Sequence, residues 1–367
     1  MAILHILVFL AGLVIAAGTI FSAIETFVVP RSVQDSLTQL VFLVVRAFFA
    51  LVLRRGKTYE NRDRIMSYYA PIALIALLPA WYILVLIGFA LMFWGIGANS
   101  LFEAFRESGS SLLTLGFAAS QGVAQTILTF VEAAVGLILV ALLIAYLPTM
   151  YSAFSRREAA VTMLEVRAGN PPSAIELILR YHRIHGLDQL RNLWSVWEAW
   201  FADVEESHSS LAPLIFFRSP APHRSWITAA GAVLDAASLT LSVVNIPSEP
   251  AAALCIRAGY ITLRRLGEFF GVTYDANVQR GSPISITRNE FDEACTTLSE
   301  NGVPVKTDLD EAWLDFTGWR ANYDASLLAL ANVTMAPYAP WSSDRTRLVP
   351  VPPMARFVKN KIRVKQT

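Results

Sequence analysis

The chain has 367 residues, of which 54% are hydrophobic and only 16% are charged. Soluble domains carry roughly 25% charged residues, so this composition excludes a single soluble globule. A net charge of +1 argues against a protein that binds nucleic acid through its overall charge. The two cysteines, Cys255 and Cys295, show no paired spacing, which excludes a disulfide scaffold.

The shortage of charge is confined to the first part of the chain. Residues 1–154 carry 8 basic and 7 acidic side chains, whereas residues 155–367 carry 22 of each. This division indicates a membrane part followed by an ordinary soluble part.

Three apolar segments come first in the membrane part. Residues 2–24 are uncharged and long enough to cross a bilayer, and they lack the basic start of a signal peptide. Residues 37–53 contain Arg46 and either span the bilayer or lie in its interface. Residues 65–102 carry no charge, and we expect a third transmembrane helix there.

The next uncharged run differs in composition. Between Glu107 and Glu132 lie 24 uncharged residues, of which 12 are Gly, Ser, Thr or Gln. A helix that faces lipid would not be half small and polar, because irregular or polar backbone at membrane depth needs protein or a water-filled cavity around it. Residues 108–125 are therefore predicted to form a short re-entrant helix and a loop, followed by a final spanning helix over residues 126–154.

The basic residues support this topology. Five of them cluster between the second and third segments, and Arg156 and Arg157 follow the last helix. The positive-inside rule places both clusters in the cytoplasm, which requires that residues 108–125 do not cross the membrane. If residues 37–53 span, four helices cross and both ends of the chain are cytoplasmic. The five residues of the first cluster are Arg54, Arg55, Lys57, Arg62 and Arg64.

The segment Thr114-Leu115-Gly116-Phe117-Ala118 lies between two apolar helices. In this setting it resembles the selectivity filter of potassium-channel-type pore-loop channels, whose core reads Thr-Val-Gly-Tyr-Gly. Thr114 and Gly116 match that pattern, Leu115 replaces valine, and Phe117 replaces tyrosine. Ala118 stands in place of the second glycine.

The resemblance implies a homotetramer, because each chain supplies one quarter of a ring of backbone carbonyls that replaces the water shell of an ion. It also implies a monovalent cation, K⁺ in the family, as the permeant species, with no other cofactor. The loss of one glycine and of the tyrosine hydroxyl leaves potassium selectivity open. The alternative interpretation is an apolar loop between two helices.

Three residues of the last helix are candidates for pore lining or gating. Gly136 follows Gly116 by 20 residues, close to a bending glycine in the family, and Pro148 is a second candidate for a bend. Glu132 shares a helix face with Gly136 and, as a costly ionisable residue, should face a cavity or a partner. Alternatively, Glu132 caps or pairs near the outer interface, and Gly136 allows close helix packing.

The soluble part shows amphipathic helical periodicity and few strand signals. No catalytic constellation is evident, since His182 and His185 form an HxxH pair without the glutamate of a zinc motif. We expect neither an enzyme nor a metal site. Helices are predicted over residues 174–185, 187–206, 224–244, 250–270, 288–298 and 309–335.

The C-terminal residues 336–367 carry seven basic side chains, one acidic side chain and five prolines. Such a tail contacts anionic lipid headgroups, binds the acidic body of its own domain, or stays disordered.

Taken together, the sequence predicts an all-α integral membrane protein with a re-entrant pore loop and a mostly α-helical cytoplasmic domain. Its predicted parts are residues 1–64, a channel module over 65–157, a helical domain over 158–335 and the tail 336–367. We expect a multi-pass cation channel of the inner (plasma) membrane, with the lipid bilayer as its surroundings and a regulatory ligand of unknown identity. The alternative is a membrane-anchored helical signalling or scaffold protein that conducts no ions.

Overall fold

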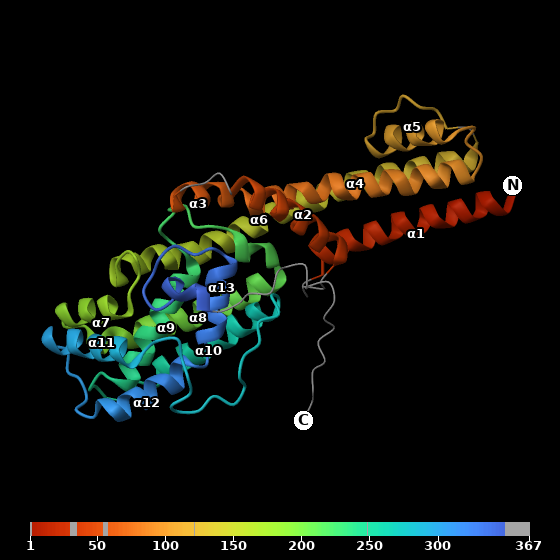
Figure 1. The fold of residues 1–367 in the computed structure, drawn as a ribbon. Helices are drawn as coiled ribbons and strands as arrows, with labels where there is room; N and C mark the ends of the chain where they lie inside the picture. The colour runs from red at the N-terminus through yellow and green to blue at the C-terminus, as the bar shows by residue number, and fades with distance from the viewer. Residues whose placement is uncertain (1, 30–34, 54–57, 121, 248, 349–367) are drawn as a thin grey trace. The chain divides into compact units, whose positions relative to one another are not determined.

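The fold is helical throughout the part of the chain that the computed structural model describes, residues 2–29, 35–53, 58–120, 122–247 and 249–348 (Figure 1). No β-strand forms within those residues, where a single isolated bridge pairs Val244 with Val305. The expectation of an all-α chain is therefore confirmed.

The chain divides into two compact units. The first unit comprises residues 1–55 and 65–152, and the second comprises residues 56–64 and 153–367. Most of the predicted segments 1–64 and 65–157 thus lie in the first unit, whereas residues 56–64 group with the second.

The first unit contains the long apolar helices. Among the described residues, four helical stretches are long and apolar enough to cross a membrane: Ala2–Phe27, Ser36–Leu53, Tyr59–Gly95 and Val123–Ala168. The sequence predicted three of these as spanning and left residues 37–53 open between a span and an interfacial helix. The corresponding helices are α1 (Ala2–Phe27), α2 (Ser36–Leu53), α3 (Tyr59–Ser67), α4 (Tyr69–Gly95) and α6 (Val123–Ala168), and α5 (Leu101–Leu112) lies between the last two.

Small residues allow α1 and α4 to pack closely. A Cβ atom added to Gly88 of α4 would lie 2.9 Å from the carbonyl oxygen of Gly12 in α1, and one added to Gly12 would overlap the carbonyl of Gly88. Trp81 of α4 donates from Nε1 to Ser22 Oγ of α1 over 3.1 Å. Because apolar side chains gain little by leaving lipid, such close backbone contact and hydrogen bonding is what holds membrane helices together.

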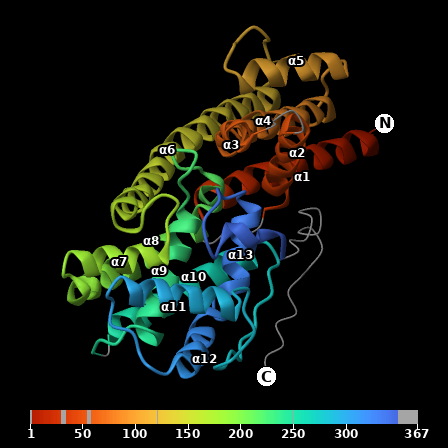
Figure 2. The same ribbon diagram turned by 60° about the vertical axis from the view of Figure 1, so that its left-hand side comes forward.

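The second unit surrounds the almost wholly buried helix α9 (Trp226–Ser242). Helices α7, α10 and α12 pack against it, and Figure 2 shows α10, α11 and α12 in this unit. Its other helices are α7 (Ala174–Arg183), α8 (Leu190–Ser210), α10 (Pro250–Glu268), α11 (Arg288–Glu300), α12 (Leu309–Arg320) and α13 (Asp324–Val333), with short 3-10 turns η1 (Leu187–Gln189), η2 (Ala212–Phe216) and η3 (Ser343–Leu348).

The prediction of one helix over residues 309–335 is wrong, because α12 ends at Arg320 and α13 begins at Asp324. The break aims two fully buried side chains at the same residue of α9. Arg320 forms an ion pair with Asp235, and Tyr323 donates from its hydroxyl to Asp235 Oδ1 over 2.8 Å. An unpaired buried charge at Asp235 would be strongly destabilising, so these tertiary contacts outweigh the local helical pattern.

Arg157, at the cytoplasmic end predicted for the last spanning helix, is fully buried in the second unit. Its guanidinium donates to the carbonyl oxygens of Leu214 and Phe217 over 2.9 and 2.7 Å and lies 3.0 Å from His208 Nε2. Burial and, secondarily, the neighbouring Arg157 charge lower the pKa of His208 well below 6.5. A neutral His208 therefore accepts a hydrogen bond from Arg157.

The beginning of the basic tail is attached to the second unit. Arg345 donates to Glu290 Oε1 over 2.7 Å and to the carbonyl oxygen of Ser285 over 2.9 Å. Although burial opposes it, the hydrogen bonds from Arg345 and Thr287 lower the pKa of Glu290 to about 2. Residues 349–367 of the tail lie outside the described residues, as do Arg54, Arg55 and Lys57 of the first basic cluster.

We predict that the stability of the second unit decreases as the pH falls below 6.5. His208 stays neutral in the folded chain, whereas a histidine in the unfolded chain takes up a proton near pH 6.5, so acid favours unfolding by up to about 1.4 kcal/mol per pH unit. Thermal unfolding of the full chain between about pH 7.5 and about pH 5.5 measures this slope.

His208→Gln keeps an oxygen that accepts from Arg157 and removes the titration, so its unfolding midpoint should depend less on pH. His223→Gln changes an exposed histidine of the same unit and should leave the slope unchanged. Equal slopes in the wild type and in His208→Gln would contradict the prediction.

Candidate functional site

Helix α5 lies alongside α4 and leads into the loop of residues 113–122 (Figure 1). The helix begins at Leu101, before the predicted start at residue 108, because Ser100 caps it: the side chain of Ser100 accepts from the backbone N–H of Glu103 over 3.1 Å. The first seven residues of α5 therefore include Glu103, Arg106 and Glu107, and only its last five, residues 108–112, have the uncharged composition on which the prediction rested.

The backbone reverses its handedness where α5 ends. Leu115 donates from its N–H to Ser110 O over 2.8 Å, and Thr114 donates to Ser111 O over 2.9 Å, the two hydrogen bonds of a Schellman C-cap. Thr114, which occupies the position usually held by glycine, has φ +54°, and Gly116 has φ +70°. Positive φ is rare for a β-branched residue, so the loop holds Thr114 in a conformation of high energy.

The segment that resembles a filter is exposed in the single chain. Thr114, Leu115, Gly116 and Phe117 are all exposed, with 60% of Leu115 and 57% of Phe117 accessible, and Ala118 is half-buried. The predicted filter residues therefore share one surface loop. The backbone N–H of Ala118 donates to Ser110 Oγ over 3.1 Å, which ties the end of this segment back to α5.

Glu132 of α6 is fully buried against α5. Ser108 donates from Oγ to Glu132 Oε1 over 2.5 Å and lies 3.0 Å from the carbonyl oxygen of Leu86 in α4. The other oxygen of Glu132 and the Oε1 atom of Glu107 are buried without a hydrogen-bond partner among the described residues. In the single chain, Glu132 thus faces the helix that carries the loop.

Gly136 lies directly under the C-terminal end of α5. A Cβ atom at this position would overlap the carbonyl oxygen of Leu112, and its next contact would be Leu112 Cδ1 at 3.2 Å. Tyr82 of α4 donates from its hydroxyl to Gly136 O over 2.8 Å. This geometry matches the close-packing interpretation of Gly136, whereas Pro148 is exposed within a helix that continues to Ala168.

Serines of α5 and of the loop hold the loop against α6, although they were not among the predicted site residues. Ser111 donates from Oγ to Thr129 O over 2.6 Å, and Ser120 of the loop lies 2.6 Å from the hydroxyl of Thr129. Together with Ser108, these residues anchor both ends of the loop to α6. The i, i+3 spacing of Ser108 and Ser111 was the available signal.

Comparison with known proteins yields no relative: no protein-family model, no curated protein and no solved structure matches the chain.

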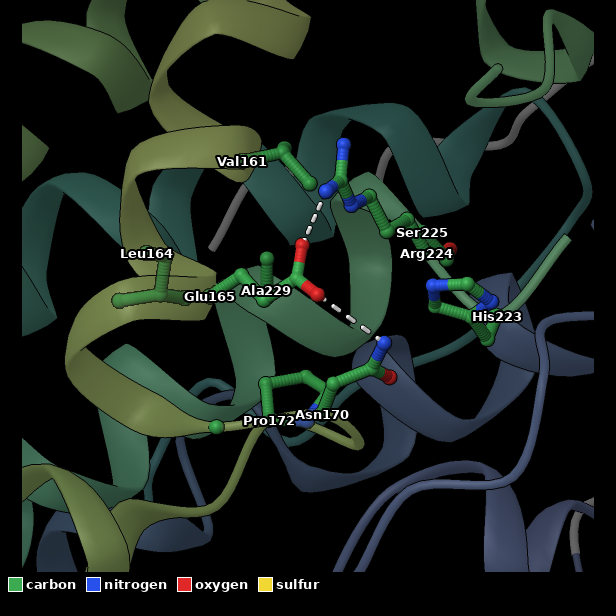
Figure 3. A pocket seen from close by; sticks show the side chains of 10 residues that line it. Val161, Leu164, Glu165, Asn170, Pro172, His223, Arg224, Ser225 and Ala229 are labelled. Carbon is green, nitrogen blue, oxygen red and sulfur yellow. Dashed lines mark hydrogen bonds and ion pairs between the residues drawn. The ribbon is translucent and has the colours of Figure 1, made fainter. Parts of the chain in front are cut away.

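A small pocket of the second unit lies between the end of α6 and the start of α9 (Figure 3). Its charged groups are already paired, since Glu165 pairs with Arg224 and accepts from Asn170 Nδ2 over 3.2 Å. Among the described residues, no group of three or more His, Cys, Asp or Glu side chains could hold a metal ion.

We predict that Gly136→Ala destabilises the first unit, because the new methyl group would push the end of α5 away from α6. Overpacking of this kind costs about 1–3 kcal/mol, so the unfolding temperature of the full chain in detergent should fall. Gly109→Ala is the matched control, since its Cβ would meet nothing closer than Leu86 Cδ1 at 3.8 Å. Equal unfolding temperatures for the two variants would contradict the close packing at Gly136.

Proposed function

We propose that this protein is a pore-loop cation channel in which four copies bring residues 113–120 to a common axis. The observation that carries the proposal is a helix that ends in an exposed loop with positive φ at Thr114 and Gly116, between two helices long enough to span a bilayer.

The backbone of the loop suits ion coordination. In an extended strand, successive residues face opposite sides. The positive φ values of Thr114 and Gly116 give this loop a different backbone conformation. Gly116 adopts its φ without steric cost, which leaves its carbonyl available to a ring of equivalent oxygens. Rings of backbone carbonyls replace the hydration shell of a cation, and one chain supplies only one member of each ring.

The exposed apolar side chains of the loop support an assembly. Leu115 and Phe117 are more than half accessible in the single chain, and the irregular backbone that carries them needs protein or a water-filled cavity around it at membrane depth. Neighbouring copies would provide that cover. Four copies would also place four equivalent Thr114–Ala118 segments around the axis.

The surrounding residues have distinct proposed roles. Ser108, Ser111 and Glu132 hold α5, and Gly136 allows α5 to approach α6. Pro148, further along α6, is the candidate for a bend near the cytoplasmic end. The permeant ion is proposed to be a monovalent cation, with K⁺ as the first to test, and ions pass without enzymatic turnover.

The long apolar helices also bear on the location of the protein in the cell. We propose that the chain is a multi-pass protein of the plasma membrane, in contact with the lipid bilayer, and that the second unit is a cytoplasmic regulatory domain.

Reconstituted full-length protein should release K⁺ from loaded liposomes faster than protein-free liposomes do, as measured with a potassium electrode. Gly116→Ala should lower the flux by about tenfold or more, because backbone strain of order 1–3 kcal/mol then falls on the loop. Gly97→Ala is the control: Gly97 also has positive φ and open space around it, but it lies between α4 and α5.

Two results would count against the channel. The first is a wild-type flux no greater than that of empty liposomes under both potassium and sodium gradients, which would favour a membrane-anchored scaffold. The second is an equal loss in Gly116→Ala and Gly97→Ala, which would indicate general damage.

A further inference from the structure

Helix α3 contains a boundary between the two units along the chain. Residues 56–64, which include most of α3, group with the second unit, yet α3 ends at Ser67 and α4 begins at Tyr69. Only Tyr68 separates the two helices, and its N–H donates to Ile65 O while its carbonyl oxygen accepts from the N–H of Ile72. A displacement of α3 therefore reaches α4 through a single intervening residue.

Arg218 holds α3 within the second unit. Its Nη1 atom forms an ion pair with Asp63 of α3, and the side chains of both residues are only 10% exposed. The same nitrogen lies 3.4 Å from the hydroxyl of Tyr59. Because a nearly buried pair is screened little by salt, and because removing one partner leaves a charge unpaired, this contact is a strong restraint on α3.

The other half of the Arg218 guanidinium binds the end of α13. Its Nη2 atom donates to Thr334 O over 2.6 Å and to Met335 O over 3.3 Å, and Tyr59 donates from its hydroxyl to Met335 O over 3.3 Å. Met335 has φ +51°, the left-handed conformation of a helix C-cap, which leaves these carbonyls free for Arg218. One guanidinium thus joins α3 to the end of α13.

Helices α4 and α6, which flank α5 and its loop, are both connected along the chain to the second unit. Helix α4 carries α5 through the contact between Ser108 and Leu86 O and is joined to α3 through Tyr68. Helix α6 follows the loop, and its last part is held within the second unit by Arg157. The second unit is thus connected along the chain to both helices that flank α5 and its loop.

We propose that Arg218, with Asp63, is a latch through which the second unit controls the position of α4 and hence of α5 and its loop. The effect of the latch on conduction rests on the proposed channel function, whereas its hold on α3 does not. Arg218 acts here as a positioning residue that joins α3 to the end of α13.

The test uses the full chain in liposomes and nanodiscs with the variants Asp63→Asn, Arg218→Gln and the double variant. Hydrogen–deuterium exchange of residues 58–68 reports the hold on α3, and K⁺ release reports conduction. Each single variant should speed the exchange of α3 and change the flux by about fivefold or more in the same direction. The double variant should differ no further, because both substitutions break one interaction.

Two further variants control for damage to the fold. Tyr59→Phe removes the hydroxyl that donates to Met335 O and accepts from Arg218 Nη1 but leaves the Arg218–Asp63 ion pair in place, so it should produce a smaller change of the same sign in both measurements. Arg280→Gln breaks exposed ion pairs with Glu311 and Asp315 in the same unit, and such pairs contribute little, so neither the exchange of α3 nor the flux should change.

Unchanged exchange of α3 in both single variants would overturn the latch, because the pair would then not hold the helix. Faster exchange with unchanged flux would overturn the coupling to the loop. A wild-type protein that conducts no ions would contradict the proposed function alone, since the exchange measurement still decides whether Arg218 and Asp63 hold α3.

Discussion

The close approach of α5 to α6 is the contact on which the candidate site depends. Gly136 provides it, because any side chain at this position would collide with the carbonyl of Leu112. The hydrogen bond from Ser111 of α5 to Thr129 O of α6 fixes the position of the end of α5 along α6. Since the loop begins one residue after Leu112, its position is set by this contact, and so is the exposure of Gly116.

The polar composition of α5 has a physical explanation in this packing. Polar groups at membrane depth must be satisfied within the protein, and the buried serines of α5 find their acceptors in the backbone of α4 and α6 and in Glu132. The low charge and high polarity of residues 108–125 therefore describe a segment built to pack against other helices.

The sequence predicted the elements whose signals are local. The apolar lengths of α1, α2, α4 and α6 were sufficient to place them as helices, and a loop does follow α5 at Leu113, within the small and polar run of residues 108–125. Contacts between distant residues were not predictable: Tyr323 and Arg320 break a helical pattern in order to reach Asp235, which is 88 and 85 positions away. Asp63 and Arg218 are 155 positions apart, so nothing in the local pattern of either residue indicated that they would pair.

The number of copies in the membrane tests the central claim most directly. A single chain provides one exposed loop, and a carbonyl ring of the proposed kind needs four. Electron cryo-microscopy of the full chain in nanodiscs should show four copies with residues 113–120 around a common axis. A monomer, or an assembly in which each loop contacts lipid separately, would contradict the account.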